Sequence, residues 1–256
     1  VISIQLKYFT MNELMNKSLA QIVTGNHRSA AVFEKYHLDF CCKGKRSLKQ
    51  ACDEQNIAIE ELLPELEKIA SGASITTGYP FDKLTQAQLI DHIVSTHHAY
   101  VKNELPQLLT YAEKVASKHG ENHPELFKIF ELVAAVKEEM ELHMKKEEQV
   151  LFPRIQEIET ITAQQKENPQ LNISYLQAPI SIMEQEHDHA GALTAEIRQL
   201  TNNYIPPQDA CTTYKLLFAS LQAFETDLHQ HVHLENNLLF PNAIKLFGKM
   251  NKPSLN

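Results

Sequence analysis

The chain has 256 residues, a formal net charge of −8, seven glycines, four cysteines and no tryptophan. The acidic balance argues against nucleic acid or an anionic membrane surface as a partner, and no apolar run reaches the roughly 18 residues of a membrane helix. Four cysteines are too few for a secreted disulfide scaffold, so we expect a cytoplasmic protein. The composition favours helices, and we predict an all-α fold.

Residues 12–70 are predicted to form a small helical domain. Ser47 is followed three residues later by Gln50, a pattern typical of a capping box that opens a helix. A last helix of this domain is expected from about Ile59. Gly, Pro, Ser and Thr are then enriched over 71–83, which we interpret as a linker.

The adjacent cysteines Cys41 and Cys42 are the chemical feature of this domain. Because they are neighbours, a disulfide between them would be strained. We expect the basic residues Lys43, Lys45 and Arg46 to lower a thiolate pKa. The pair is a candidate for redox chemistry, iron transfer or contact with a partner. The alternative is a buried structural pair.

The rest of the chain, residues 84–248, is predicted to be an antiparallel four-helix bundle. The expected helices span 85–118, 124–157, 179–203 and 209–246. A longer polar connector is expected at 158–178, and the other connections are short, which makes sequential neighbours antiparallel. Pro153 and Pro241 are expected to kink the ends of the second and fourth helices.

A repeated His-x3-Glu motif lies on two of these helices. His143 and Glu147 recur as His231 and Glu235 at a constant offset (231 − 143 = 235 − 147 = 88), and each copy continues into Leu-Phe-Pro. Residues four apart share one helix face, and here that face is the apolar seam. Since a buried carboxylate without compensation costs several kcal/mol, the pattern indicates a bound cation.

One further histidine lies on the seam of each remaining helix. These are His98 and His187, which are 89 residues apart (187 − 98 = 89). Counting from the helix ends places His98 level with His143 in an antiparallel pair. His97 is about 100° off the seam, so we expect it to be solvated or to lie outside the ligand set.

Four imidazoles and two carboxylates on one cross-section predict a centre for two metal ions with nitrogen and oxygen ligands. The absence of thiolates from the set argues against structural zinc and iron–sulfur sites, and iron fits best, with manganese next. The alternative is a set of buried histidines satisfied by the two glutamates without metal.

These motifs resemble the hemerythrin-like di-iron domain, and the segment from Tyr36 through Cys41 and Cys42 to Gly44 resembles the repair-of-iron-centres family (ScdA/YtfE type). The resemblance implies two non-haem iron ions, oxo- and carboxylate-bridged, for which manganese or zinc could substitute. It implies terminal histidine ligands and bridging glutamates. The implied terminal ligands are His98, His143, His187 and His231, and the implied bridges are Glu147 and Glu235.

The resemblance also implies a stress protein that repairs iron–sulfur clusters damaged by oxidants or nitric oxide, mainly by donating iron. The partners are then damaged iron–sulfur proteins, with NO or O2 as small ligands and a homodimer left open. Two alternatives remain: a di-iron enzyme that reduces nitric oxide or peroxide, and an O2 or NO sensor. Steady turnover with a supplied reductant would favour the enzyme, whereas a ligand-driven change at a partner surface would favour the sensor.

Overall fold

The computed structural model describes residues 13–71, 81–164 and 171–250. Within these ranges the chain is helical and has no β-strand, apart from an isolated bridge between Ser18 and Ser47. The all-α prediction is therefore confirmed.

By its contacts the chain divides into two compact units. The first combines the residues up to Leu84 with the short segment Val232–Leu238, and the second combines Thr85–His231 with the residues from Leu239 onward. Most of the predicted linker at 71–83 lies outside the described residues, so the boundaries 12–70 and 84–248 stay a prediction.

Between Leu19 and Ser71, the first unit contains four short α-helices. They are α2 (Leu19–Gly25), α3 (Ser29–Lys35), α4 (Leu48–Gln55) and α5 (Ile59–Ser71). Capping boxes open two of them, because the Ser18 and Ser47 side chains accept from the backbone N–H of Gln21 and Gln50. The predicted box at Ser47 is thus confirmed. Fully buried side chains such as Phe33 form the core between the helices.

A glycine is required two residues after the second cysteine of the pair. A Cβ atom on Gly44 would lie 2.1 Å from the backbone oxygen of Phe40, a separation that real Cβ atoms do not adopt. The Gly44 carbonyl accepts a hydrogen bond of 2.9 Å from the backbone N–H of Ala20 at the start of α2. The close approach therefore ties the loop that carries the cysteines to the first helix.

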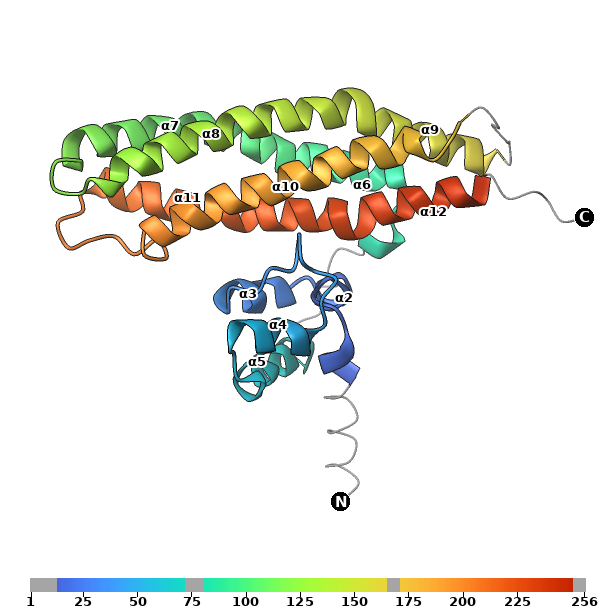
Figure 1. Cartoon of the computed structure of the whole chain (residues 1–256), viewed down its shortest axis with the longest axis horizontal. Helices are drawn as coiled ribbons and strands as arrows, with labels where there is room; N and C mark the ends of the chain where they lie inside the picture. The colour runs from blue at the N-terminus through green and yellow to red at the C-terminus, as the bar shows by residue number, and fades with distance from the viewer. Residues whose placement is uncertain (1–12, 72–80, 165–170, 251–256) are drawn as a thin grey trace, which may run out of the picture. The chain divides into compact units, whose positions relative to one another are not determined.

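The chain from Gln86 onward forms four long helical rods that lie side by side (Figure 1), and the fourth rod includes the segment Val232–Leu238. The first rod is α6 (Gln86–His92), η2 (Ile93–His98) and α7 (Ala99–His119). The second is α8 (Glu125–Lys146), η3 (Glu147–Leu151) and α9 (Phe152–Ala163). The third is α10 (Ser174–Leu200). The fourth is α11 (Thr212–Leu234), η4 (Glu235–Leu239) and α12 (Phe240–Met250).

Three of the rods contain a π-helical turn, namely η2, η3 and η4. Proline follows two of these turns, since Pro153 and Pro241 are each the second residue of the next α-helix. A proline has no N–H to donate to the residue four positions earlier, which breaks the α-helical hydrogen-bond register at that point. The predicted perturbation at the two prolines thus takes the form of a wider turn just before each.

The connector between the second and third rods is shorter than predicted. Helix α9 continues to Ala163 and α10 begins at Ser174, whereas the sequence pattern suggested a connector at 158–178. Pro179 does not open the third helix but lies inside it, so the carbonyl of Tyr175 receives no helical hydrogen bond from the proline nitrogen. The Arg154 guanidinium of α9 donates to that carbonyl instead, at 2.9 Å.

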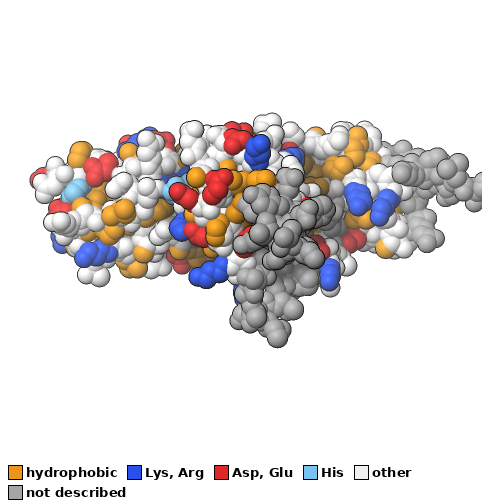
Figure 2. Space-filling model, turned by 90° about the horizontal axis from the view of Figure 1, so that it is seen from below, with side chains coloured by type: hydrophobic (Ala, Val, Ile, Leu, Met, Phe, Trp, Pro, Cys, Tyr) orange, Lys and Arg blue, Asp and Glu red, His pale blue; other side chains and the backbone are white. Residues whose placement is uncertain are grey.

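One face of the protein carries mixed charge (Figure 2). Acidic and basic side chains are interspersed on the face shown in Figure 2. None of the described helices combines the length and apolarity needed to cross a membrane.

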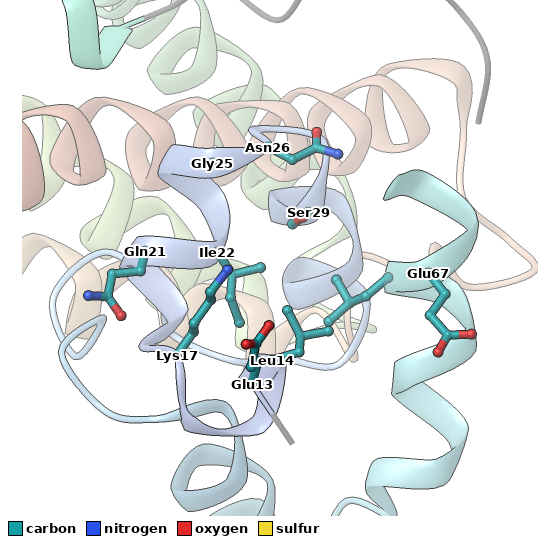
Figure 3. A pocket seen from close by; sticks show the side chains of 10 residues that line it. Glu13, Leu14, Lys17, Gln21, Ile22, Gly25, Asn26, Ser29 and Glu67 are labelled. Carbon is teal, nitrogen blue, oxygen red and sulfur yellow. The ribbon is translucent and has the colours of Figure 1, made fainter. Parts of the chain in front are cut away.

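The first unit has a pocket of about 380 Å³ beside α2, α3 and α5 (Figure 3). Leu14, Ile22 and Leu66 supply its apolar lining, and Glu13 and Lys17 are among its polar residues. The residues that line the pocket include no His or Cys, so it does not contain the metal-binding chemistry that the sequence predicts.

Candidate metal centre

The six residues predicted as ligands come together in the interior of the bundle. They form two groups of four, and the potential ligand atoms of each group lie within 4.8 Å of one another. The first group is His98, Glu147, His231 and Glu235, and the second is His143, Glu147, His187 and Glu235. Both groups share the same two glutamates. Each of the six residues is at most 2% exposed.

The imidazoles face each other in pairs through their Nε2 atoms. The Nε2 atoms of His98 and His231 are 3.2 Å apart, and those of His143 and His187 are 3.0 Å apart. Glu147 lies between the groups, because its Oε2 atom is 3.2 Å from His143 Nε2 and 3.4 Å from His98 Nε2. One carboxylate oxygen therefore approaches one histidine of each group.

These separations fit metal coordination. Two ligands at right angles on an octahedral ion with bonds of about 2.1 Å lie about 3.0 Å apart, close to the Nε2–Nε2 and Nε2–Oε2 distances. Two carboxylates at 0% exposure would be strongly unfavourable without a cation to compensate them. The donor set is nitrogen and oxygen without sulfur, which suits iron or manganese.

The π turns lie at the ligands. His98 is the last residue of η2, Glu147 the first of η3 and Glu235 the first of η4. Local π turns inside α-helices frequently mark functional sites, since the wider turn changes the direction of neighbouring side chains. Here the turns occur where three rods present their ligands.

Two of the candidate ligand histidines each form a hydrogen bond with a glutamate from another helix. His98 Nδ1 is 2.8 Å from Glu148 Oε1, which also accepts from Lys102 Nζ at 2.7 Å. Partial burial by itself raises the pKa of Glu148, but hydrogen bonds from the lysine and the histidine outweigh it, and the net shift is downward. Glu148 is therefore an ionised acceptor at neutral pH.

His143 has the same arrangement. Its Nδ1 atom is 3.0 Å from Glu186 Oε2, and Lys146 bonds the other oxygen of that carboxylate. The hydrogen bond from His143 is the largest cause that lowers the pKa of Glu186, and with Lys146 it brings the pKa to about 2 against the effect of burial. Outer carboxylates of this kind fix the tautomer and orientation of a metal-binding histidine.

Comparison with known proteins identifies the chain's family. The profile described as Hemerythrin HHE cation binding domain matches residues 89–243, and the ScdA_N profile, described as a domain of unknown function, matches residues 15–70. A protein named iron–sulfur cluster repair protein YtfE from Pectobacterium atrosepticum is 35% identical over 230 residues, which are 90% of this chain and 97% of that protein. The protein of the same name from Yersinia pestis is 36% identical with the same coverage.

The chain belongs to the YtfE family. The resemblance inferred from the sequence is thereby confirmed, and the hemerythrin HHE domain makes the bundle a cation-binding domain.

In this member of the YtfE family, His97 lies outside both groups of candidate ligands, which is one of the two positions expected for it, but it is not solvated. It is 4% exposed, and its Nδ1 atom is 2.9 Å from Asp227 Oδ1. Its ring stacks on His231 with the centroids 5.6 Å apart and the planes at 5°. The π turn explains the difference, because a wider turn rotates successive side chains by less than the 100° of an α-helix. His97 therefore packs against a ligand without joining either group.

The cysteine pair of this YtfE relative lies in a loop organised by Asp39. The Asp39 Oδ1 atom accepts backbone N–H bonds from Cys41, Cys42 and Lys43 at 3.1, 2.9 and 3.2 Å. The two sulfur atoms are 3.8 Å apart, and both thiols are free. Cys41 is 4% exposed, whereas Cys42 is partly exposed.

The expectation that basic neighbours would depress the thiol pKa is wrong for Cys41. The hydrogen bond with Cys42, burial and the charge of Asp39 raise the pKa of Cys41 well above its ordinary value. Cys41 is consequently a protonated thiol at neutral pH.

Another residue of the first unit contacts this loop. Asn237 belongs to the segment Val232–Leu238, and its Nδ2 atom donates to the backbone oxygen of Cys41 at 3.0 Å. Asn237 is two residues after Glu235 on η4. The sequence held no signal for this contact, because the two residues are 196 positions apart.

Proposed function

We propose that this chain binds two iron ions and repairs iron–sulfur clusters damaged by oxidative or nitrosative stress by donating iron to them. The observation that carries the proposal is the pair of buried His2Glu2 groups that share Glu147 and Glu235. The names of the YtfE relatives support the repair function.

In this proposal two histidines would hold each ion, and Glu147 and Glu235 would serve both. His98 and His231 bind one ion, and His143 and His187 bind the other. When bound, iron supplies an exchangeable, redox-active cation with coordination positions left for further ligands. Manganese and zinc are substitutes that the same donors accept.

The residues around the ligands prepare the site for metal. Glu148 and Glu186 each accept from the Nδ1 atom of a histidine, which places the lone pair of Nε2 toward the interior of the group. The carboxylates of Glu147 and Glu235 supply the negative charge that neutralises two cations in a buried site. The protein would therefore hold the metal with a preorganised set of imidazoles and shared carboxylates.

We assign to the cysteine loop a part in the transfer of iron or electrons. Cys42 is the accessible sulfur of the pair, and Cys41 lies beside it as a buried thiol. A Cys41→Ser, Cys42→Ser variant should keep two irons per chain but restore a client more slowly. If the variant restores the client at the wild-type rate and unfolds at the wild-type temperature, the cysteines have no part in repair.

The decisive experiment is anaerobic transfer. The chain is loaded with ferrous iron, its iron content is measured, and it is mixed with an apo iron–sulfur protein, sulfide and a reductant. We expect the loaded chain to restore the cluster faster than the same amount of iron added together with the His143→Ala, His231→Ala variant or offered as a weak chelate. Equal rates would refute donation. Steady consumption of nitric oxide or peroxide without loss of iron would instead favour the enzyme alternative.

A further inference from the structure

Two of the candidate ligand histidines are linked to the protein surface by hydrogen bonds through a glutamate and a lysine. In each chain of side chains, a histidine bonds a glutamate and the glutamate bonds a lysine. The two chains are His98–Glu148–Lys102 and His143–Glu186–Lys146. We refer to them as the Lys102 latch and the Lys146 latch.

The two latches are built in the same way. The lysine is one helical turn after the histidine on the same rod, at four residues in one case and three in the other. The glutamate comes from the next rod in the chain, η3 for the Lys102 latch and α10 for the Lys146 latch. Each glutamate therefore bridges two side chains of the preceding rod.

Exposure rises stepwise along each latch. In the Lys102 latch the side chains are 0%, 31% and 50% exposed from histidine to lysine. In the Lys146 latch they are 2%, 28% and 48% exposed. The candidate ligands are otherwise at most 2% exposed, so these outer glutamates give the two histidines a link to solvent.

Each latch serves a different metal group. His98 belongs to the group with His231, and His143 belongs to the group with His187. The histidine of a latch is oriented by an outer carboxylate, and the position of that carboxylate depends in turn on its lysine. If the lysine bond is lost, the half-exposed glutamate can turn toward water, and the imidazole loses the bond that holds its Nε2 atom on the ion.

We propose that the Lys102 and Lys146 latches set the rate at which the two irons leave, one latch for each ion. The inference rests on the proposed function, since it takes iron as the bound ion. Glu148, Glu186 and the two lysines are positioning residues, because they act through a ligand histidine and not on the metal.

The test measures iron release from the full-length chain. The protein is loaded anaerobically with two ferrous ions, excess ferrozine is added, and the coloured complex is followed in time. Because the lysine is one step further from the metal than the outer carboxylate, we expect Lys102→Met to accelerate the loss of one ion about three- to tenfold. Lys146→Met should accelerate the loss of the other ion by a similar factor, and the double variant should accelerate both.

Substitution of the carboxylate should have a larger effect. Glu148→Ala and Glu186→Ala remove the bond to the histidine itself, for which a loss of about ten- to a hundredfold in metal affinity is expected. Lys102→Arg and Lys146→Arg keep the cation and should restore release close to the wild-type rate.

Lys137 provides a matched control. It bonds Glu141 at 2.7 Å on the same helix as Lys146, and Glu141 is exposed and is not one of the outer glutamates. Lys137→Met should leave release unchanged, and all lysine variants should unfold near the wild-type temperature. The proposal is refuted if Lys102→Met and Lys146→Met both release iron at the wild-type rate. It is also refuted if Lys137→Met accelerates iron release as much as they do.

The release assay separates this inference from the proposed function. If the lysine variants release iron faster to ferrozine but the wild-type chain never restores an apo cluster, the latches stand and donation fails. If the chain donates iron to clusters but the lysine variants release it no faster, the proposed function is supported and the role of the latches in iron release is refuted.

Discussion

The glutamates shared by the two metal groups should limit the stability of the metal-free protein. Glu147 and Glu235 are both fully buried beside imidazoles. A carboxylate oxygen of each lies within 4.8 Å of one from the other, so two like charges are buried together in the metal-free protein. The structure therefore predicts that Glu147→Gln with Glu235→Gln, which removes both charges at nearly constant volume, stabilises the apo protein.

The size of the effect follows from the cost of burying charge. Replacing the two buried charges with neutral groups of similar volume is worth about 2 kcal/mol, within the range seen for buried ionic groups. For a chain of this size each kcal/mol moves the unfolding temperature by about 2–4 °C, so the apo variant should unfold about 4–8 °C higher than the apo wild type. Ferrous iron should raise the unfolding temperature of the wild type only, because the variant lacks both bridges.

Scanning calorimetry of the four samples, with and without iron, measures both effects. Glu141→Gln, at an exposed position of α8, is the matched control and should change stability by less than about 0.5 kcal/mol. An apo Gln variant that unfolds below the apo wild type, or a Gln variant stabilised by iron as much as the wild type, would refute the reasoning.

Three further outcomes are expected. His143→Ala and His231→Ala should each lower the iron content from two ions to one, since each removes a ligand from a different group, and the double variant should hold none in metal analysis. His98→Ala should lose one ion, whereas His97→Ala should keep both and lose stability in thermal unfolding, because its ring packs on a ligand without joining a group. At pH 7, mass spectrometry should find Cys41 slow to react with iodoacetamide, and its rate should go on rising with pH after that of an ordinary thiol, with a pKa of about 8.5, has levelled off, because its hydrogen bond with the neighbouring cysteine and its burial raise its pKa.

The ligand residues could be predicted because helical periodicity is a local property. The spacing of His143 and Glu147 on an apolar stripe determines that both face the core of a bundle, whatever the other helices do. The recurrence at His231 and Glu235 then indicates that two rods carry equivalent halves of one centre. That the six residues ligate iron stays a prediction, which the metal analyses above test.

The π turns could be predicted only in part. A proline follows η3 and η4, so a break in the α-helical register is foreseeable near Pro153 and Pro241. No proline follows η2, and its wider turn arises in the packed bundle. The burial of His97 depends on that turn, which is why a regular helical wheel placed this residue off the seam and left its burial open.

The latches depend on how neighbouring rods are aligned. Glu148 and His98 are 50 residues apart, and whether they meet depends on the relative height of two helices to within one turn, which sequence-based helix ends do not give. One part of the signal was nevertheless present in the sequence. A lysine one turn after a seam histidine, as at Lys102, places a cation near that histidine. A carboxylate from the next helix can then accept hydrogen bonds from both the lysine and the histidine. Two features together thus predict an outer carboxylate from sequence. One is a lysine one turn after a seam histidine, and the other is an acidic residue next to a candidate ligand on the following helix.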